Sequence, residues 1–91
     1  MITAYSVEEN KELNSELKKL QNRAKRLILS DYYHHIHLSD LQYSILTMIT
    51  NAETHKDINP YLWNSRMMPD VLDYISKELK QARKDDRKNR R

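Results

Sequence analysis

Three histidines and two tyrosines stand within the six positions from Tyr32 to His37, and they have more chemical scope than any other segment. His34 and His37 would share a face of a helix, and His35 and His37 one face of a strand, so either pair offers two imidazole ligands to a metal ion. The only other histidine is His55, the chain has no cysteine, and no HExxH spacing occurs. We therefore expect no metal site and no cofactor.

The same segment has three other interpretations. The favoured one is structural: the apolar and tyrosine side chains close the end of the core while the histidines stay half exposed, and these core residues are Tyr32, Tyr33, Ile36 and Leu38. Alternatively, tyrosine and histidine rings stack on bases or nucleotides. Because histidine titrates near neutral pH, the segment is also a candidate pH-sensitive joint.

Trp63 is the only tryptophan in the chain. Tryptophan and tyrosine are enriched at the centres of protein interfaces, where they supply much of the binding energy. The sequence therefore predicts a protein-binding surface, with four candidate residues: Trp63, Tyr32, Tyr33 and His35.

Positive charge is concentrated at the C-terminal end. Residues 80–91 carry seven basic and two acidic side chains, a net +5, so the net charge of +3 leaves −2 for the other residues. Such a run neutralises phosphates in nucleic-acid-binding proteins, although terminal basic runs also serve only for solubility. The candidate phosphate-binding residues are Lys80, Arg83, Lys84, Arg87 and Lys88, to which Arg23 and Arg26 are possible additions.

Several function classes are excluded or disfavoured. The chain has no glycine, whereas phosphate-binding loops of the P-loop and dinucleotide kinds need glycine for close backbone approach. Its neighbouring acidic residues lie near predicted helix starts, where a favourable interaction with the helix dipole explains them without acid–base catalysis. No Ser or Thr lies beside a His and an acidic residue in the pattern of a catalytic triad. No apolar run suits a signal peptide or a membrane span. We expect a non-enzymatic, cytoplasmic protein.

The first long helix is predicted from about Val7 to about Leu29. Ser6 followed by Glu9 fits a capping box. Apolar residues then repeat at alternating spacings of four and three and form a narrow stripe, which must be buried against another helix: Leu13, Leu17, Leu20, Ala24 and Leu27. Basic residues on the outer side suit the C-terminal end of the helix dipole, with a phosphate-binding patch as the alternative.

Three further helices are predicted. Ser39 and Gln42 form a second capping box, so a buried helix runs from Asp40 to about Glu53. Asn59 is an N-cap with Pro60 at the first position of a short helix that reaches Met68. Pro69 then serves as the first residue of the last helix, whose apolar stripe is Leu72, Ile75, Leu79 and Ala82. A helix-turn-helix is disfavoured, because about six residues separate the second and third helices and the third has one basic residue, Arg66.

These elements predict an all-α fold, a small helical bundle with long first and last amphipathic helices. Residues 1–82 form one helical domain and residues 83–91 a basic, frayed tail. After Ala82 we expect the last helix to continue for a turn or two as a charged rod before it frays. The long first and last helices can pair with each other or with copies of themselves in another subunit. Two stripes and a tryptophan helix exceed what so small a monomer covers comfortably, so we expect a homo-oligomer, in which Asn10 could fix the register.

The favoured function is a small binding or regulatory protein that inhibits or adapts another macromolecule through its aromatic and histidine surface. One alternative is a nucleic-acid-associated regulator that uses the basic tail. Another is an oligomer that captures a small anionic ligand between subunits. The size, the lack of targeting signals and the high Lys, Asn and Ile content fit a phage or mobile-element accessory protein.

Overall fold

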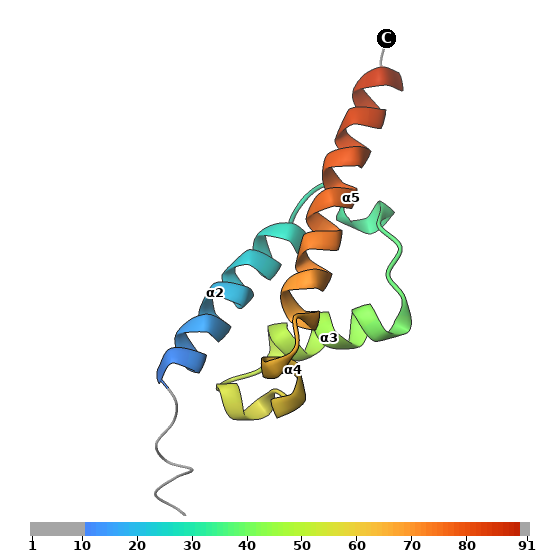
Figure 1. Cartoon of the computed structure of the whole chain (residues 1–91). Coiled ribbons are helices and arrows are strands. Elements are labelled where there is room, and N and C mark those ends of the chain that lie inside the picture. The colour runs from blue at the N-terminus through green and yellow to red at the C-terminus, as the bar shows by residue number, and fades with distance from the viewer. Residues whose placement is uncertain (1–10, 90–91) are drawn as a thin grey trace, which may run out of the picture.

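The computed structural model describes residues 11–89, and within that range the fold is all-α, as the sequence predicts. Four α-helices pack against one another, with a short 3₁₀ helix in each of two connections (Figure 1). In chain order the elements are α2 (Lys11–Ile28), η1 (Tyr33–His35), α3 (Asp40–Asn51), η2 (His55–Asp57), α4 (Pro60–Asn64) and α5 (Met67–Asn89). The first capping box and Asn10 lie outside the described residues.

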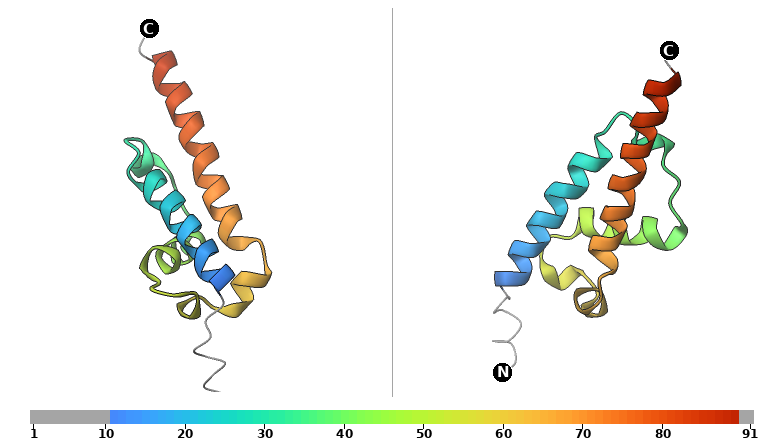
Figure 2. Two further views of the ribbon diagram at one scale, coloured as in Figure 1. Left: turned by 90° about the vertical axis from the view of Figure 1, so that its left-hand side faces the viewer. Right: turned by 45° about the horizontal axis from the view of Figure 1, so that its top comes forward.

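The apolar stripe of α2 is buried within the same chain. Leu17 and Ala24 are fully buried, and Leu20 and Leu27 are partly buried beside them. Both α3 and α5 contact α2, and Figure 2 shows α2 and α5 running side by side while α3 crosses them. The stripe of α2 therefore has its partners in α3 and α5, and it does not itself require a second copy of the chain.

The second capping box is confirmed at the start of α3. The Ser39 hydroxyl accepts the backbone N–H of Gln42 at 3.1 Å, and the Gln42 side chain accepts the backbone N–H of Ser39 at 2.9 Å. The C-terminal end of α3 is bound by a side chain of α2. The Gln21 amide donates hydrogen bonds to the backbone carbonyls of Ile49 (3.0 Å) and Ala52 (2.8 Å). The helix ends at Asn51, two residues before the predicted end.

The start of α5 differs from the prediction. Asn59 caps α4 by accepting the Tyr61 N–H at 2.9 Å, as expected, but α4 ends at Asn64 and α5 begins at Met67. Pro69 is therefore the third residue of α5 and not its first. Proline is tolerated there, because backbone N–H groups of the first turn have no acceptor within the helix.

The C-terminal segment is helical to Asn89. The apolar positions stop at Ala82, and α5 continues beyond them as a charged helix, as expected, over part of the segment that was predicted to fray. Two side-chain hydrogen bonds stabilise this extension: Gln81 to Asp85 at 3.1 Å, and the hydroxyl of Tyr32 to Asp86 at 2.8 Å. Figure 1 shows the end of α5 projecting beyond the other helices as a rod.

The core lies where α2, α3 and α5 meet. Its largest fully buried side chains are Ile49, Ile58, Met68, Leu72 and Ile75. Among the described residues no polar or charged side chain is fully buried, so the core is held by apolar contacts. None of the helices between residues 11 and 89 is long and apolar enough to cross a membrane.

Candidate functional site

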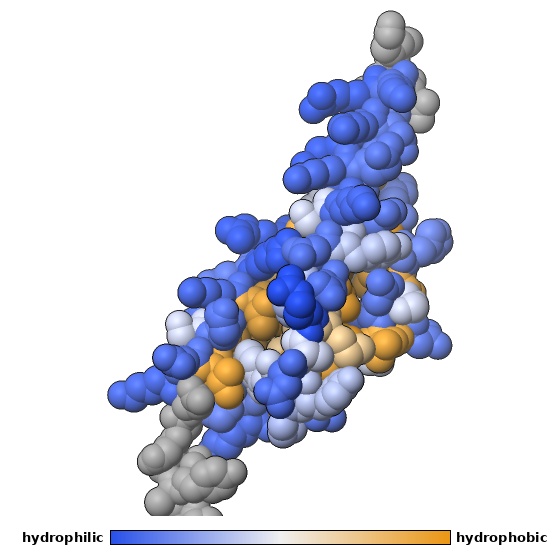
Figure 3. Space-filling view, viewed as in Figure 1, coloured by the Kyte–Doolittle hydropathy of each residue, from blue (hydrophilic) through white to orange (hydrophobic). Residues whose placement is uncertain are grey.

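The basic residues of the C-terminal half of α5 lie mainly on its outward side. At about 100° per residue, five of them fall within one sector about 100° wide that faces away from the buried Leu79. This basic face consists of Lys77, Lys80, Lys84, Arg87 and Lys88, all exposed. Arg83 is also exposed but lies nearer the core side of the helix. Figure 3 shows that hydrophilic residues cover this part of α5.

The acidic residues of the same half-helix lie elsewhere. Glu78 and Asp85 fall on the opposite flank, about 100–120° from Leu79 in the other direction. Asp86 continues the line of buried residues and accepts the hydroxyl hydrogen of Tyr32 at 2.8 Å. The charges of the second half of α5 are therefore sorted by face, and this half is not simply a mixed, solubilising run. In the first half of α5, Asp70 and Asp73 lie at the same angle as the basic face, and they pair with Arg66 and Arg23.

The basic face has no carboxylate partner among residues 11–89. The ion pairs among residues 11–89 are Arg23 with Asp73 at 2.7 Å and Arg66 with Asp70 at 3.8 Å. Neither involves a cation of the basic face, so these charges are available to an external anion. Because Arg23 is already paired with Asp73, Arg26, which is exposed on α2, is the better candidate of the two additional arginines.

The Tyr32–His37 segment closes one end of the core, as the structural interpretation predicts. Tyr32, Tyr33, Ile36 and Leu38 are partly buried against the core. Burial raises the pKa of the Tyr33 hydroxyl, and the nearby Tyr43 raises it further. His34 and His35 are exposed, with ring centroids 4.1 Å apart.

A groove of about 360 Å³ separates this segment from α5. Its lining is mixed, with a histidine and a tyrosine on one side and carboxylates on the other: Tyr32, His35, Ile36, Glu78, Gln81, Ala82, Asp85 and Asp86. Across the described part of the chain, no three His, Cys, Asp or Glu side chains are grouped closely enough to hold a metal ion.

The four residues predicted to bind a protein partner do not form one surface. Trp63 lies on α4, where it is half buried and its indole N–H donates to the His55 carbonyl at 3.3 Å. Tyr32, Tyr33 and His35 lie at η1, and Figures 1 and 2 both place α4 and η1 at different ends of the folded body. The indole N–H of Trp63 is thus already satisfied within the fold.

Among residues 11–89, the two most exposed tyrosines were not among the predicted site residues. Tyr43 on α3 is 60% exposed and Tyr61 on α4 is 67% exposed. The sequence did contain one indication of an unusual surface around Tyr43, namely the lack of charge. Of the 29 charged residues in the chain, α3 carries one, Asp40.

A helix-turn-helix is not supported by the geometry of α4 and α5 either. Residues 65 and 66 alone join these helices, so the turn is tighter than the one between α3 and α4. However, the exposed acidic residues near the start of α5 are Asp70 and Asp73, and α4 has only five residues. Carboxylates at the start of a recognition helix would repel the phosphate backbone.

Comparison of the chain with protein-family models, with curated proteins and with solved structures finds no match.

Proposed function

We propose that this chain is a small non-enzymatic regulator that associates with nucleic acid through the basic face of α5. The observation that carries the proposal is the sorting of charge on the second half of this helix. Five cations lie outward without a carboxylate partner among the described residues, while the acids lie on the other flank or against the fold.

The dimensions of the basic face suit a phosphate backbone. Lys77 and Lys88 are eleven residues apart, which corresponds to about 16 Å along a helix. One strand of duplex DNA presents about five phosphates over that axial length. Binding would release the counterions condensed on those phosphates, so we expect affinity to fall steeply as the salt concentration rises.

The chemistry of the basic face favours low sequence preference. Four of its five residues are lysines, which bind phosphate as point charges, whereas base recognition relies on bidentate arginine, asparagine and glutamine contacts. Glu78 and Asp85 on the flank would repel phosphates and so restrict the nucleic acid to the outward side of α5.

The other functions considered have less support. A protein-binding surface made of Trp63, Tyr32, Tyr33 and His35 would require residues that lie at different ends of the fold. Capture of a small anion would require a pocket lined by cations, but the groove beside α5 contains carboxylates and the basic face is the convex side of a helix.

The test compares two triple variants that change the net charge equally. Lys80→Gln/Lys84→Gln/Arg87→Gln neutralises the centre of the basic face. Fluorescence anisotropy with a labelled DNA duplex at about 0.1 M salt should show an affinity roughly 10²-fold lower, because three phosphate contacts are lost.

The matched control is Lys11→Gln/Lys18→Gln/Lys25→Gln. These three lysines are exposed, are spaced by seven residues and share one side of α2. Circular dichroism should show that both variants keep their helical content. The proposal is wrong if the two variants lose affinity equally, or if the wild-type protein does not bind the duplex.

A further inference from the structure

The ion pair between Arg23 and Asp73 lies on the same side of α5 as the basic face. At about 100° per residue, Asp73 falls within the sector that the five cations occupy, and Lys77 follows it by one helical turn. The Asp73 carboxylate lies 2.7 Å from the guanidinium of Arg23. An arginine of α2 is therefore held at the end of the row of cations on α5.

The last turns of α2 carry cations beside α5. Figures 1 and 2 show the two helices side by side and running in the same direction. Arg26 is exposed about one turn beyond Arg23, just as Lys77 is one turn beyond Asp73. Because the helices run in parallel, Arg26 and Lys77 lie at a similar level, and the cations of α2 and α5 share one side of the molecule.

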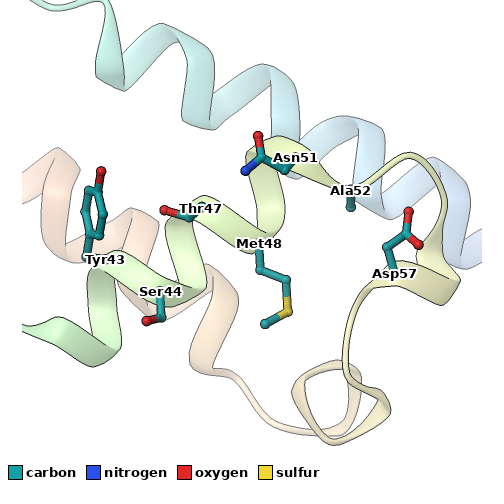
Figure 4. A pocket seen from close by; sticks show the side chains of 7 residues that line it. All are labelled: Tyr43, Ser44, Thr47, Met48, Asn51, Ala52 and Asp57. Carbon is teal, nitrogen blue, oxygen red and sulfur yellow. The ribbon is translucent and has the colours of Figure 1, made fainter.

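The other surfaces next to α5 do not extend the basic face. The flank of α5 that carries Glu78 and Asp85 would repel a polyanion. Helix α3 has a groove of about 460 Å³, but Figure 4 shows only neutral side chains and the Asp57 carboxylate around it. The acidic residues of α2, Glu12 and Glu16, lie toward the start of that helix. The C-terminal end of α2 is therefore the adjacent surface that supplies cations.

The ion pair is weak enough to exchange its carboxylate for a phosphate. The side chains of Arg23 and Asp73 are 35% and 57% exposed, and ion pairs between solvent-exposed groups add little to stability. A phosphate offers the same guanidinium two charge-assisted hydrogen bonds in the geometry that arginine prefers. One strand of duplex DNA presents a phosphate about every 3.4 Å along its axis, so a strand bound along the basic face has phosphates within one helical turn of Lys77.

We propose that Asp73 competes with nucleic acid for Arg23, so that this ion pair is an autoinhibitory contact within the binding surface. The inference rests on the proposed function, because it needs a polyanion bound along the basic face of α5. In the free chain Asp73 holds Arg23 and adds a negative charge at the end of the row of cations. A phosphate that takes over the guanidinium leaves Asp73 unpaired beside the polyanion, and this repulsion lowers the affinity of the wild-type protein.

The test measures affinity for a labelled DNA duplex by fluorescence anisotropy at about 0.1 M salt. Asp73→Ala removes the competing carboxylate and should bind about fivefold more tightly than wild type, because Arg23 gains one phosphate contact. The slope of log K against log salt should become about 0.9 steeper. Because Asp73 is exposed and alanine favours helix, circular dichroism should show that the variant keeps its helical content.

Two further variants separate the release of Arg23 from a general effect of charge. Arg23→Gln/Asp73→Ala has the net charge of the wild type and should return to the wild-type affinity and slope. Glu53→Ala raises the net charge as much as Asp73→Ala does. Glu53, however, lines a groove with Asn14 and Gln21, which lie on the opposite flank of α2 from Arg23. Since salt screens distant charges, the affinity of Glu53→Ala should stay within about twofold of wild type.

The possible results distinguish this inference from the proposed function. If Asp73→Ala binds like wild type while the α5 triple variant still loses affinity, Asp73 does not compete with nucleic acid and the basic face remains the binding surface. Equal gains in Asp73→Ala and Glu53→Ala, or a gain that persists in Arg23→Gln/Asp73→Ala, would overturn the inference as well, because Arg23 would not be responsible. A wild-type protein that does not bind the duplex would contradict both.

Discussion

At the residue scale, the contact between Tyr32 and Asp86 joins parts of the chain that are 54 positions apart. The tyrosine hydroxyl donates to a carboxylate, and hydrogen bonds to charged groups are stronger than those between neutral groups. The bond attaches the η1 segment to the second half of α5 and fixes Asp86 toward the fold. It therefore helps to keep this carboxylate away from the basic face.

Tyr32→Phe should lower the free energy of unfolding by about 1 kcal/mol, because it removes this hydrogen bond and keeps the ring. The measurement is urea unfolding followed by circular dichroism. Tyr61→Phe, on an exposed ring, should change stability by less than about 0.5 kcal/mol. Equal stability of Tyr32→Phe and wild type would show that the contact does not stabilise the fold.

We expect Asp57 to make the stability of the fold depend on pH. The backbone N–H groups of Glu53 and then Thr54 donate to its carboxylate and lower its pKa below the ordinary value. Since the folded-state pKa is lower than the unfolded one, the stabilisation is fully present above the ordinary aspartate pKa near 4 and is lost as the pH falls through the folded-state pKa.

Asp57→Asn should therefore be less stable than wild type at pH 7, and the difference should shrink as the solution is acidified below about pH 4. Urea unfolding of both proteins at a series of pH values measures this difference. A difference that stays constant over the whole series would contradict a stabilising role for the ionised carboxylate.

Some of these residue-scale features could be predicted and some could not. Ser39 with Gln42, and Asn59 with Pro60, were identified because caps depend on residues within three positions. The Tyr32 to Asp86 bond could not be identified, since it depends on how η1 meets α5 in three dimensions. The exposed position of Tyr43 was equally invisible until the packing of α3 was known.

At the scale of elements, the Gln21 side chain of α2 connects the two helices by hydrogen bonds to the C-terminal end of α3. The last carbonyl groups of a helix have no acceptor role within it, and Gln21 of α2 donates to two of those at the end of α3. This contact fixes where α3 stops and how it lies against α2. The pattern of apolar residues in either helix gave no indication of it.

Gln21→Met should lower the free energy of unfolding by about 1–2 kcal/mol, because two carbonyl groups lose their donor while the length of the side chain is kept. Urea unfolding again provides the measurement. Gln81→Met is the matched control: Gln81 is exposed and bonds only one turn along its own helix, so a change below about 0.5 kcal/mol is expected. If both variants lose equal stability, the bonds of Gln21 to α3 have no special role.

The bounds of the elements show where local rules are insufficient. Pro69 was expected at the first position of α5, but the helix begins two residues earlier, since all first-turn positions tolerate a missing N–H. The end of α5 was expected to continue for a turn or two beyond its last apolar residue, Ala82, and then to fray. Asp85 and Asp86 instead take part in side-chain hydrogen bonds that support the helix.

At the scale of the whole molecule, helical periodicity was sufficient to predict an all-α fold, because the 3.6-residue repeat of apolar positions is independent of tertiary detail. The partners of the stripes were left open, because the first and last helices could pair with each other or with a second copy of the chain. Leu17 and Ala24 are buried against neighbouring helices of the same chain. The stripes that suggested an oligomer therefore have partners within the chain itself.

The candidate site became definable only with the fold. The basic residues were visible in the sequence, but their separation from Glu78 and Asp85 has meaning only once α5 is known to remain helical to Asn89. A frayed segment would present a mixture of charges, whereas a helix presents one basic side.

The most direct test of phosphate binding by α5 is the salt dependence of affinity for duplex DNA. The slope of log K against log salt should be about 2.7 less steep for Lys80→Gln/Lys84→Gln/Arg87→Gln than for wild type, since each phosphate contact contributes about 0.9. The Lys11→Gln/Lys18→Gln/Lys25→Gln control should keep the wild-type slope. Identical slopes for wild type and the α5 variant would contradict binding through the basic face.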